Sequence, residues 1–141
     1  MKVRWMLAAV LAPMLLLAGC ANDPTRGKER ALRDTLRSYA STLRWGDIAQ
    51  AQIFLDPAYL EQHPLSETDL ARYRQVQVSQ YSEHPAVPIG DTEVHQTVEI
   101  GLINVHTQNM RTIVDRQVWR YDARQKRWWL MSGLPDITRR D

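Results

Sequence analysis

The fold is decided by the stretch Glu93-Val94-His95-Gln96-Thr97-Val98-Glu99-Ile100-Gly101-Leu102-Ile103-Asn104-Val105, in which apolar and polar side chains alternate. Successive side chains of a β-strand point to opposite faces, so the alternation predicts a long, half-buried strand. Gln96 is the polar residue on the otherwise apolar face, and His95 lies on the opposite face. Beyond Gly101 the apolar residues change parity to Ile103 and Val105, which predicts a β-bulge or bend in this strand.

Three further segments complete the predicted sheet. Residues 75–81 alternate in the same way, and residues 110–121 and 127–131 are each preceded by a polar turn. Residues 83–91 contain two prolines and a glycine and are predicted to form a loop. The order predicts an antiparallel meander.

The chain before this sheet has a helical period. A long helix from Pro24 to Trp45 is predicted, because Asp23 suits the N-cap, Pro24 the first helical position and Gly46 the stop. One face of this helix is apolar, formed by Leu32, Leu36, Tyr39 and Leu43.

Two shorter helices are expected next. One covers residues 48–55, with Ile53, Phe54 and Leu55 facing inward, and residues 58–60 add a turn. The other begins at the capping sequence Ser66-Glu67-Thr68-Asp69 and ends near Tyr73. Helices followed by a meander predict the α+β class, with N-terminal helices packed on a bent antiparallel sheet.

A basic stripe flanks the apolar face of the first helix and contains Arg26, Arg30, Arg33 and Arg37. One hypothesis is that these arginines contact anionic lipid. The other is a solvated helix face, in which Glu29 pairs with Arg33 and Asp34 pairs with Arg30 and Arg37. The sequence favours the solvated face.

Residues 1–19 are typical of a signal peptide, with a basic start and an apolar run from Trp5 to Leu17. The run has 13 residues and is interrupted by Pro13, which argues against a permanent transmembrane helix, since spanning takes about 20 residues. A second interpretation is a plain secretory signal, in which the cysteine at the end of the segment has no special role. The segment ends in Leu17-Ala18-Gly19-Cys20, with the only cysteine of the 141 residues.

This ending resembles the lipobox of bacterial lipoproteins of an uncharacterised proteobacterial family. The resemblance implies cleavage before Cys20, its acylation with palmitate, and a membrane-tethered protein. Ala21 after the cysteine implies the periplasmic face of the cell outer membrane, with the inner membrane left open. The expected organisation is a signal at residues 1–19, a tether at 20–23, one domain at 24–138 and a polar tail at 139–141.

Removing residues 1–19 changes the charge balance. The chain has 18 basic and 16 acidic residues, and Lys2 and Arg4 leave with the signal, so the remainder is formally neutral. A neutral domain has no global field that attracts nucleic acid, and no nucleic-acid partner is predicted. With Cys20 acylated, no disulfide within the chain is expected.

Some features of the predicted domain resemble the nuclear transport factor 2-like (cystatin-like) superfamily. These features are the helix ending at Trp45-Gly46-Asp47, the sequence Phe54-Leu55-Asp56-Pro57-Ala58-Tyr59, and the hairpin from Val118 to Leu130. The resemblance implies a bent sheet wrapped into a cone around the long helix, often with a pocket. Its members include isomerases and dehydratases as well as non-enzymatic binding and assembly domains, so the fold does not choose a function.

No cofactor and no metal site are predicted. The four histidines, His63, His84, His95 and His106, do not form an HxxxH pair, and His95 and His106 are expected to face solvent. The remaining catalytic candidate is Asp115, with Gln117 or Gln96 as a ligand-binding, orienting donor. A catalytic role for Asp115 requires that the strand face carrying Ile113, Trp119 and Tyr121 points inward. If the opposite face points inward, Arg116 and Arg120 lie inside instead. The sequence favours an Asp115 that is exposed or ion-paired.

The last hairpin carries a candidate partner surface. Trp128 and Trp129 are adjacent and must point to opposite faces, so one fills the core. The other, beside Arg127, either marks a partner or membrane surface or packs in a cation–π pair within the hairpin, which is favoured.

These patterns predict a lipid-anchored, periplasm-facing envelope protein that acts as a non-enzymatic binding or assembly module. Its partners are the membrane, through the lipid on Cys20, and an envelope protein or small ligand whose identity the sequence leaves open. The alternative is a pocket enzyme of the isomerase or dehydratase type that uses a buried carboxylate.

Overall fold

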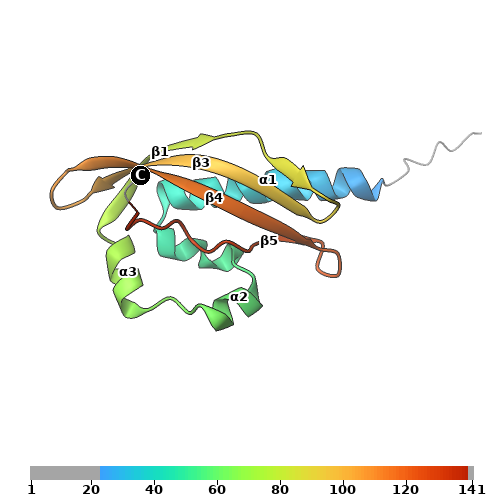
Figure 1. Ribbon diagram of the computed structural model, residues 1–141, viewed down its shortest axis with the longest axis horizontal. Helices are drawn as coiled ribbons and strands as arrows, with labels where there is room; N and C mark the ends of the chain where they lie inside the picture. Colours follow the sequence, from blue (N-terminus) through green and yellow to red (C-terminus); the bar gives the residue numbers. More distant parts are fainter. Residues whose placement is uncertain (1–22, 140–141) are drawn as a thin grey trace, which may run out of the picture.

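The computed structural model describes residues 23–139. The expectations for residues 1–19, Cys20, the tether up to residue 22 and the last two residues of the tail lie outside this range. The described chain has N-terminal helices packed on a curled antiparallel sheet that forms a half-barrel (Figure 1). The predicted α+β class is therefore confirmed.

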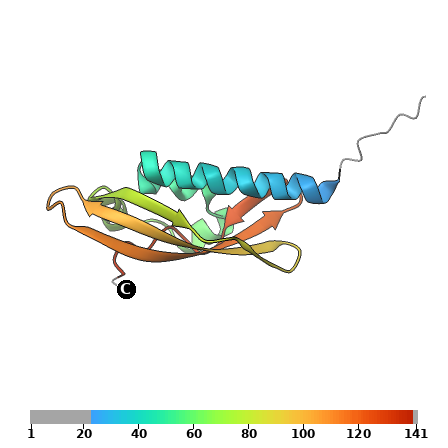
Figure 2. The same ribbon diagram turned by 90° about the horizontal axis from the view of Figure 1, so that it is seen from above.

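Helix α1 (Pro24–Trp45) has the predicted bounds. The Asp23 side chain accepts a hydrogen bond from the Thr25 amide at 3.0 Å, and the Gly46 amide donates to the Thr42 carbonyl at 2.9 Å. The helix lies across one face of the sheet (Figure 2), with Tyr39 and Leu43 buried against it.

The next segment is a 3₁₀ helix, η1 (Ile48–Phe54), capped by Asp47. In a 3₁₀ helix, side chains three apart share a face. Ile48, Ala51 and Phe54 are accordingly buried, whereas Ile53 is 62% exposed. The prediction that Ile53 faces inward is wrong for this reason.

Two short helices follow, α2 (Pro57–Gln62) and α3 (Glu67–Tyr73). The Asp56 side chain caps α2, which is longer than the single turn predicted. Helix α3 begins with the predicted capping box: Ser66 accepts from the Asp69 amide, and the Asp69 carboxylate accepts from the Ser66 amide, both at 3.1 Å.

The sheet has the strand order β1-β3-β4-β5, all antiparallel. The bounds are β1 (Val76–Glu83), β3 (Glu93–Asn104), β4 (Met110–Asp122) and β5 (Arg127–Leu130). A further strand, β2 (Val87–Ile89), pairs with the start of β3 inside the segment predicted to be a loop. Its proline is tolerated because β2 pairs on one side only.

The predicted bulge lies on a different strand. β3 pairs with β4 without a shift from Glu93 to Ile103, so its parity does not change. The register shift falls in β1, between Val78 and Gln80. A Cβ at Gly101 would lie 2.8 Å from Ser79 Oγ, so the glycine makes room for the bulge on its neighbour.

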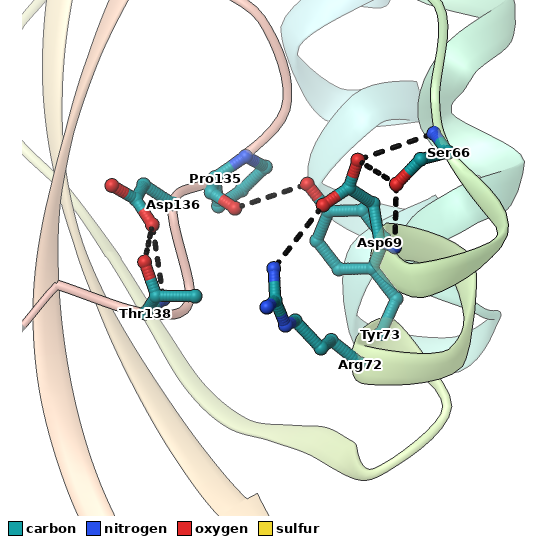
Figure 3. A network of polar contacts seen from close by, with 7 residues as sticks. All are labelled: Ser66, Asp69, Arg72, Tyr73, Pro135, Asp136 and Thr138. Atoms are coloured by element: carbon teal, nitrogen blue, oxygen red, sulfur yellow. Dashed lines mark hydrogen bonds and ion pairs between the residues drawn. The ribbon is translucent and has the colours of Figure 1, made fainter.

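The C-terminal segment after β5 packs back onto α3. The Tyr73 hydroxyl donates to the Pro135 carbonyl at 3.4 Å, beside the capping box of α3 and the Asp136–Thr138 turn (Figure 3). On the sheet side, Arg111 Nη2 donates to the Ile137 carbonyl. Buried Ile137 thereby joins the core, in which Tyr39 packs edge-on against Phe54 and Trp119.

Candidate functional site

Three polar side chains are buried on the sheet face that α1 covers. Gln96 is 6% exposed, Asp115 9% and Gln117 1%. Gln96 pairs directly with Gln117 across β3 and β4, so both point to the same face. The face of β4 that carries Ile113 and Trp119 therefore points inward, and Arg116 and Arg120 are exposed.

Gln117 organises this buried group. Its Nε2 donates to Asp115 Oδ2 at 2.8 Å and to the Tyr81 hydroxyl at 3.0 Å. Its Oε1 accepts from Trp119 Nε1 at 3.1 Å. These bonds use both ends of the carboxamide and fix its orientation, so Gln117 links β1 and β4 within the core.

Asp115 is a carboxyl group held inside the protein. Burial raises the pKa of Asp115 to about 6, and the hydrogen bond from Gln117 opposes this rise. No cation among residues 23–139 forms an ion pair with it. The interpretation of Asp115 as exposed or ion-paired is wrong, because the inward face of β4 is the one that carries it.

Two tyrosines lie near this carboxyl group, of which Tyr39 is buried and Tyr81 is half-buried. Burial raises the pKa of Tyr39 and of Tyr81 well above the usual range, and the charge of Asp115 adds to the effect. The Tyr39 hydroxyl has no hydrogen-bond partner within the described chain. Sequence periodicity assigned Tyr39 to the core, but nothing in it indicated that its hydroxyl would lie near an acid.

A groove of about 420 Å³ lies between α1, β1 and β3. Tyr81 and Gln96 line it from the sheet, and Arg33, Arg37 and Arg44 line it from the helix. Asp115 does not line the groove. Among the residues hydrogen-bonded through Gln117, only Tyr81 lines the groove, and its hydroxyl accepts from Gln117.

The Gln96 carboxamide has a hydrogen-bond partner at its nitrogen but none at its oxygen within residues 23–139. Its Nε2 donates to the His84 carbonyl at 3.1 Å, which fixes the carboxamide. Its Oε1 is covered and has no hydrogen-bond partner within residues 23–139. A buried carbonyl without a donor carries a cost of about 1–3 kcal/mol, so this oxygen is an unmet acceptor beside the groove.

The arginines of α1 are almost free of ion pairs. Arg26 lies 3.9 Å from Asp23, and both side chains are exposed. In the described part of the chain, Arg30, Arg33 and Arg37 form no ion pair, so the expected pairs with Glu29 and Asp34 are not made. The stripe keeps its positive charge.

The side chains of the four histidines lie at the surface, although the His84 backbone carbonyl accepts the hydrogen bond from Gln96. His95 Nε2 is 2.7 Å from Glu93 Oε1, and His84 Nε2 is 3.4 Å from Glu99 Oε1. His63 stacks on Tyr59, and His106 is exposed. Between residues 23 and 139, no three His, Cys, Asp or Glu side chains are grouped so that they could hold a metal ion.

The adjacent tryptophans point to opposite faces, as predicted. Trp128 is buried, and its Nε1 donates to the Lys28 carbonyl of α1 at 3.1 Å. Trp129 is half-buried, with the Arg127 guanidinium 4.0 Å from the centre of its ring. Arg127 also donates to the Ile53 carbonyl at 2.7 Å, so the cation–π pair favoured by the sequence is present and anchored.

Sequence reasoning missed several members of the groove, among them Tyr81, Arg44 and Trp45. Tyr81 was predicted only as part of a strand, and Arg44 and Trp45 only as the end of a helix. Arg44 continues the stripe of Arg30 and Arg37 at helical spacing, which is a signal the sequence did contain. The position of Tyr81 depends on the bulge in β1, which the sequence placed on another strand.

No helix in residues 23–139 is both long enough and apolar enough to cross a membrane. No family model, curated protein or solved structure matches the chain.

Proposed function

We propose that this protein is a lipid-anchored, periplasm-facing envelope protein that binds a ligand or partner in the groove between α1 and the sheet without transforming it. The observation that carries the proposal is the separation of the groove from Asp115. The groove presents arginines, a carboxamide and a phenol, which are groups that bind and orient. Asp115, the acid suited to proton transfer, is hydrogen-bonded to Gln117 and does not line the groove.

The proposed address rests on Leu17-Ala18-Gly19-Cys20 and on the start of α1 at Pro24. Few residues separate the proposed lipid on Cys20 from the helix, and four extended residues span only about 13 Å. Such a short tether holds the domain close to a membrane face. We propose the outer membrane, from Ala21 after the cysteine.

The proposed superfamily is the nuclear transport factor 2-like fold. A long helix lying against a curled antiparallel sheet supports it (Figure 2). The superfamily contains both enzymes and binding domains, so the assignment leaves the function to the site.

One observation favours the alternative of an isomerase- or dehydratase-type enzyme. Asp115 is buried, and its pKa of about 6 suits a general base near neutral pH. A base must lie within hydrogen-bond reach of the substrate proton, and Asp115 does not line the groove. We therefore place binding ahead of catalysis.

In-cell photo-crosslinking tests the proposal. A photoreactive amino acid at Ser41, which lines the groove, is compared with the same group at Arg116, which is exposed on the opposite face of the sheet. The proposal predicts adducts that form at Ser41 and not at Arg116. Equal labelling at both positions, or none at either, contradicts a binding role for the groove.

Metabolic labelling tests the anchor separately. Cells are fed a clickable palmitate analogue, and the wild-type chain is compared with Cys20→Ser. The anchor predicts label on the wild type and none on the variant. Label that persists on Cys20→Ser shows that lipid is attached elsewhere.

A further inference from the structure

The groove between α1, β1 and β3 carries an excess of positive charge that no acid in it balances. Arg33, Arg37 and Arg44 line it from the helix, and Glu83 is the only acidic residue among those that line it. Within residues 23–139, neither Arg33 nor Arg37 forms an ion pair, and Glu83 forms none either. The groove therefore has a formal charge of about +2 near neutral pH.

Helix α1 sets the spacing of these three arginines. Arg33, Arg37 and Arg44 are four and seven residues apart, so all three project from one side of α1. The Arg44 guanidinium lies 5.2 Å from the centre of the Trp45 ring, which also lines the groove. Guanidinium groups pair with the oxygens of phosphate through two parallel hydrogen bonds, so several of them suit a ligand with several anionic oxygens.

A second observation comes from the sheet. Gln96 is 6% exposed and lines the groove, and its Oε1 has no hydrogen-bond partner in the described chain. The bond from Nε2 to the His84 carbonyl prevents the carboxamide from turning its oxygen elsewhere. The oxygen is covered in this conformation, so a donor on a ligand reaches it only when a side chain that lines the groove moves. The partner it lacks is a donor, such as a hydroxyl group.

We propose that the groove binds a phosphate monoester that carries a neighbouring hydroxyl group, with Arg33 and Arg37 on the phosphate and Gln96 Oε1 accepting from the hydroxyl, while Arg44 adds to the positive charge of the groove. A phosphate monoester carries about −1.5 to −2 at neutral pH, which matches the charge of the groove. This inference rests on the proposed binding function and names its ligand class. The same chemistry is present in a soluble phosphate ester such as glycerol 3-phosphate and in a lysolipid whose phosphomonoester headgroup lies beside a free hydroxyl group.

Calorimetric titration of the full-length protein in a neutral detergent tests the proposal. The probes are glycerol 3-phosphate and inorganic phosphate, followed by micelles that contain lysophosphatidic acid, which keeps a free hydroxyl beside its phosphate, or lysophosphatidylcholine. Saturable binding of glycerol 3-phosphate, competed by inorganic phosphate, supports a soluble ligand. Binding confined to lysophosphatidic acid micelles supports a headgroup. Binding of none of the probes, or equal binding to lysophosphatidylcholine, overturns the proposal.

Matched variants separate a site from general electrostatics. Arg33→Gln combined with Arg37→Gln removes two charges from the groove, whereas Arg26→Gln combined with Arg30→Gln removes two charges from the same stripe outside it. The first pair is expected to weaken binding by about tenfold or more and the second by less than about twofold. Equal losses from both pairs overturn the assignment to the groove.

Two substitutions at Gln96 test the acceptor. Gln96→Met keeps the size and removes the carbonyl, and Gln96→Glu keeps an acceptor but adds a negative charge. Gln96→Met is expected to weaken glycerol 3-phosphate by about threefold or more and to leave inorganic phosphate less affected, and Gln96→Glu is expected to weaken both. An unchanged affinity in a Gln96→Met protein with wild-type melting temperature contradicts the role of Gln96.

Different results would refute the binding function and the ligand class. Groove-specific adducts in cells without phosphate binding in solution show that the ligand class is wrong while the binding function stands. Absence of groove-specific adducts together with absence of phosphate binding refutes both.

Discussion

Gln117 Nε2 lies 2.8 Å from Asp115 Oδ2, and this hydrogen bond joins two side chains that the core almost completely covers. The same carboxamide accepts from Trp119 and donates to Tyr81, so three strand positions depend on it. The arrangement keeps an acid inside the protein without a cation. Its consequences for stability are measurable.

Asp115→Asn is expected to stabilise the protein at neutral and alkaline pH. Burial raises the pKa of Asp115 from 3.8 to about 6, so ionisation is harder in the folded state than in the unfolded state. The wild type therefore loses stability as pH rises through about 4 to 6, and the loss is complete above that window. A shift of two pKa units corresponds to about 3 kcal/mol, so the variant should gain up to about 3 kcal/mol at pH 8. Urea unfolding at pH 4 and pH 8 measures the difference.

Asp34→Asn is the control, because it makes the same change at an exposed position of α1. It should change stability by less than about 0.5 kcal/mol at both pH values. A gain for Asp115→Asn that is the same at pH 4 and pH 8 is incompatible with a titrating buried acid.

Gln117→Met is expected to destabilise the protein by about 2–4 kcal/mol. It leaves Trp119 Nε1 without an acceptor and Asp115 without its donor, and each unsatisfied buried group costs about 1–3 kcal/mol. The pKa of Asp115 should rise further, because the bond from Gln117 favours the ionised carboxylate. Carbon-13 NMR titration of the carboxyl group measures the pKa. Gln77→Met at an exposed position of β1 is the control, and equal destabilisation by both would refute the role of Gln117.

Gly101→Ala is expected to destabilise the protein by about 1–3 kcal/mol. The added Cβ would lie 2.8 Å from Ser79 Oγ and 3.1 Å from Gln80 Cβ, so the bulge in β1 must shift. Ser79→Ala in the same chain should recover part of the loss, because it removes the nearest atom. Gly27→Ala in α1 meets no atom within 4 Å and should instead stabilise by up to about 1 kcal/mol. Thermal unfolding measures all of these variants, and a neutral Gly101→Ala would show that the bulge adapts freely.

Arg111→Met is expected to loosen the C-terminal segment. Its guanidinium donates to the Ile137 carbonyl, which ties residues after β5 to β4. Loss of this bond should cost about 1 kcal/mol and speed amide exchange near Ile137. Arg116→Met, also exposed on β4, is the control. Exchange that is unchanged near Ile137 would show that packing alone holds the segment.

Local chemistry made much of the fold predictable. The caps at Asp23 and Ser66 and the stop at Gly46 act within a few residues, so helices α1 and α3 could be placed from the sequence. Alternation up to Gly101 did the same for β3, including the face on which Gln96 lies, and the preceding polar turn helped to place β4.

The failures have two physical causes, which are a local change of helix type and long-range pairing. The exposure of Ile53 follows from the 3₁₀ spacing of η1, whereas the site of the bulge depends on which strand lies beside Gly101. The burial of Asp115 depends on which face of β4 meets α1, which the sequence left open between two alternatives. The groove joins residues of α1 to residues of β1 and β3, so no local pattern predicts it.

The most direct test of the central claim, that a ligand binds in the groove without reaching the buried acid, is NMR of Gln96 and Asp115 in one titration. Glycerol 3-phosphate is added to the full-length protein, and the Gln96 side-chain amide and the Asp115 carboxyl carbon are followed across pH. The account predicts a saturable shift of the Gln96 amide and an unchanged Asp115 pKa near 6. A ligand-dependent shift of the Asp115 pKa with a silent Gln96 amide would contradict it and favour the proton-transfer enzyme.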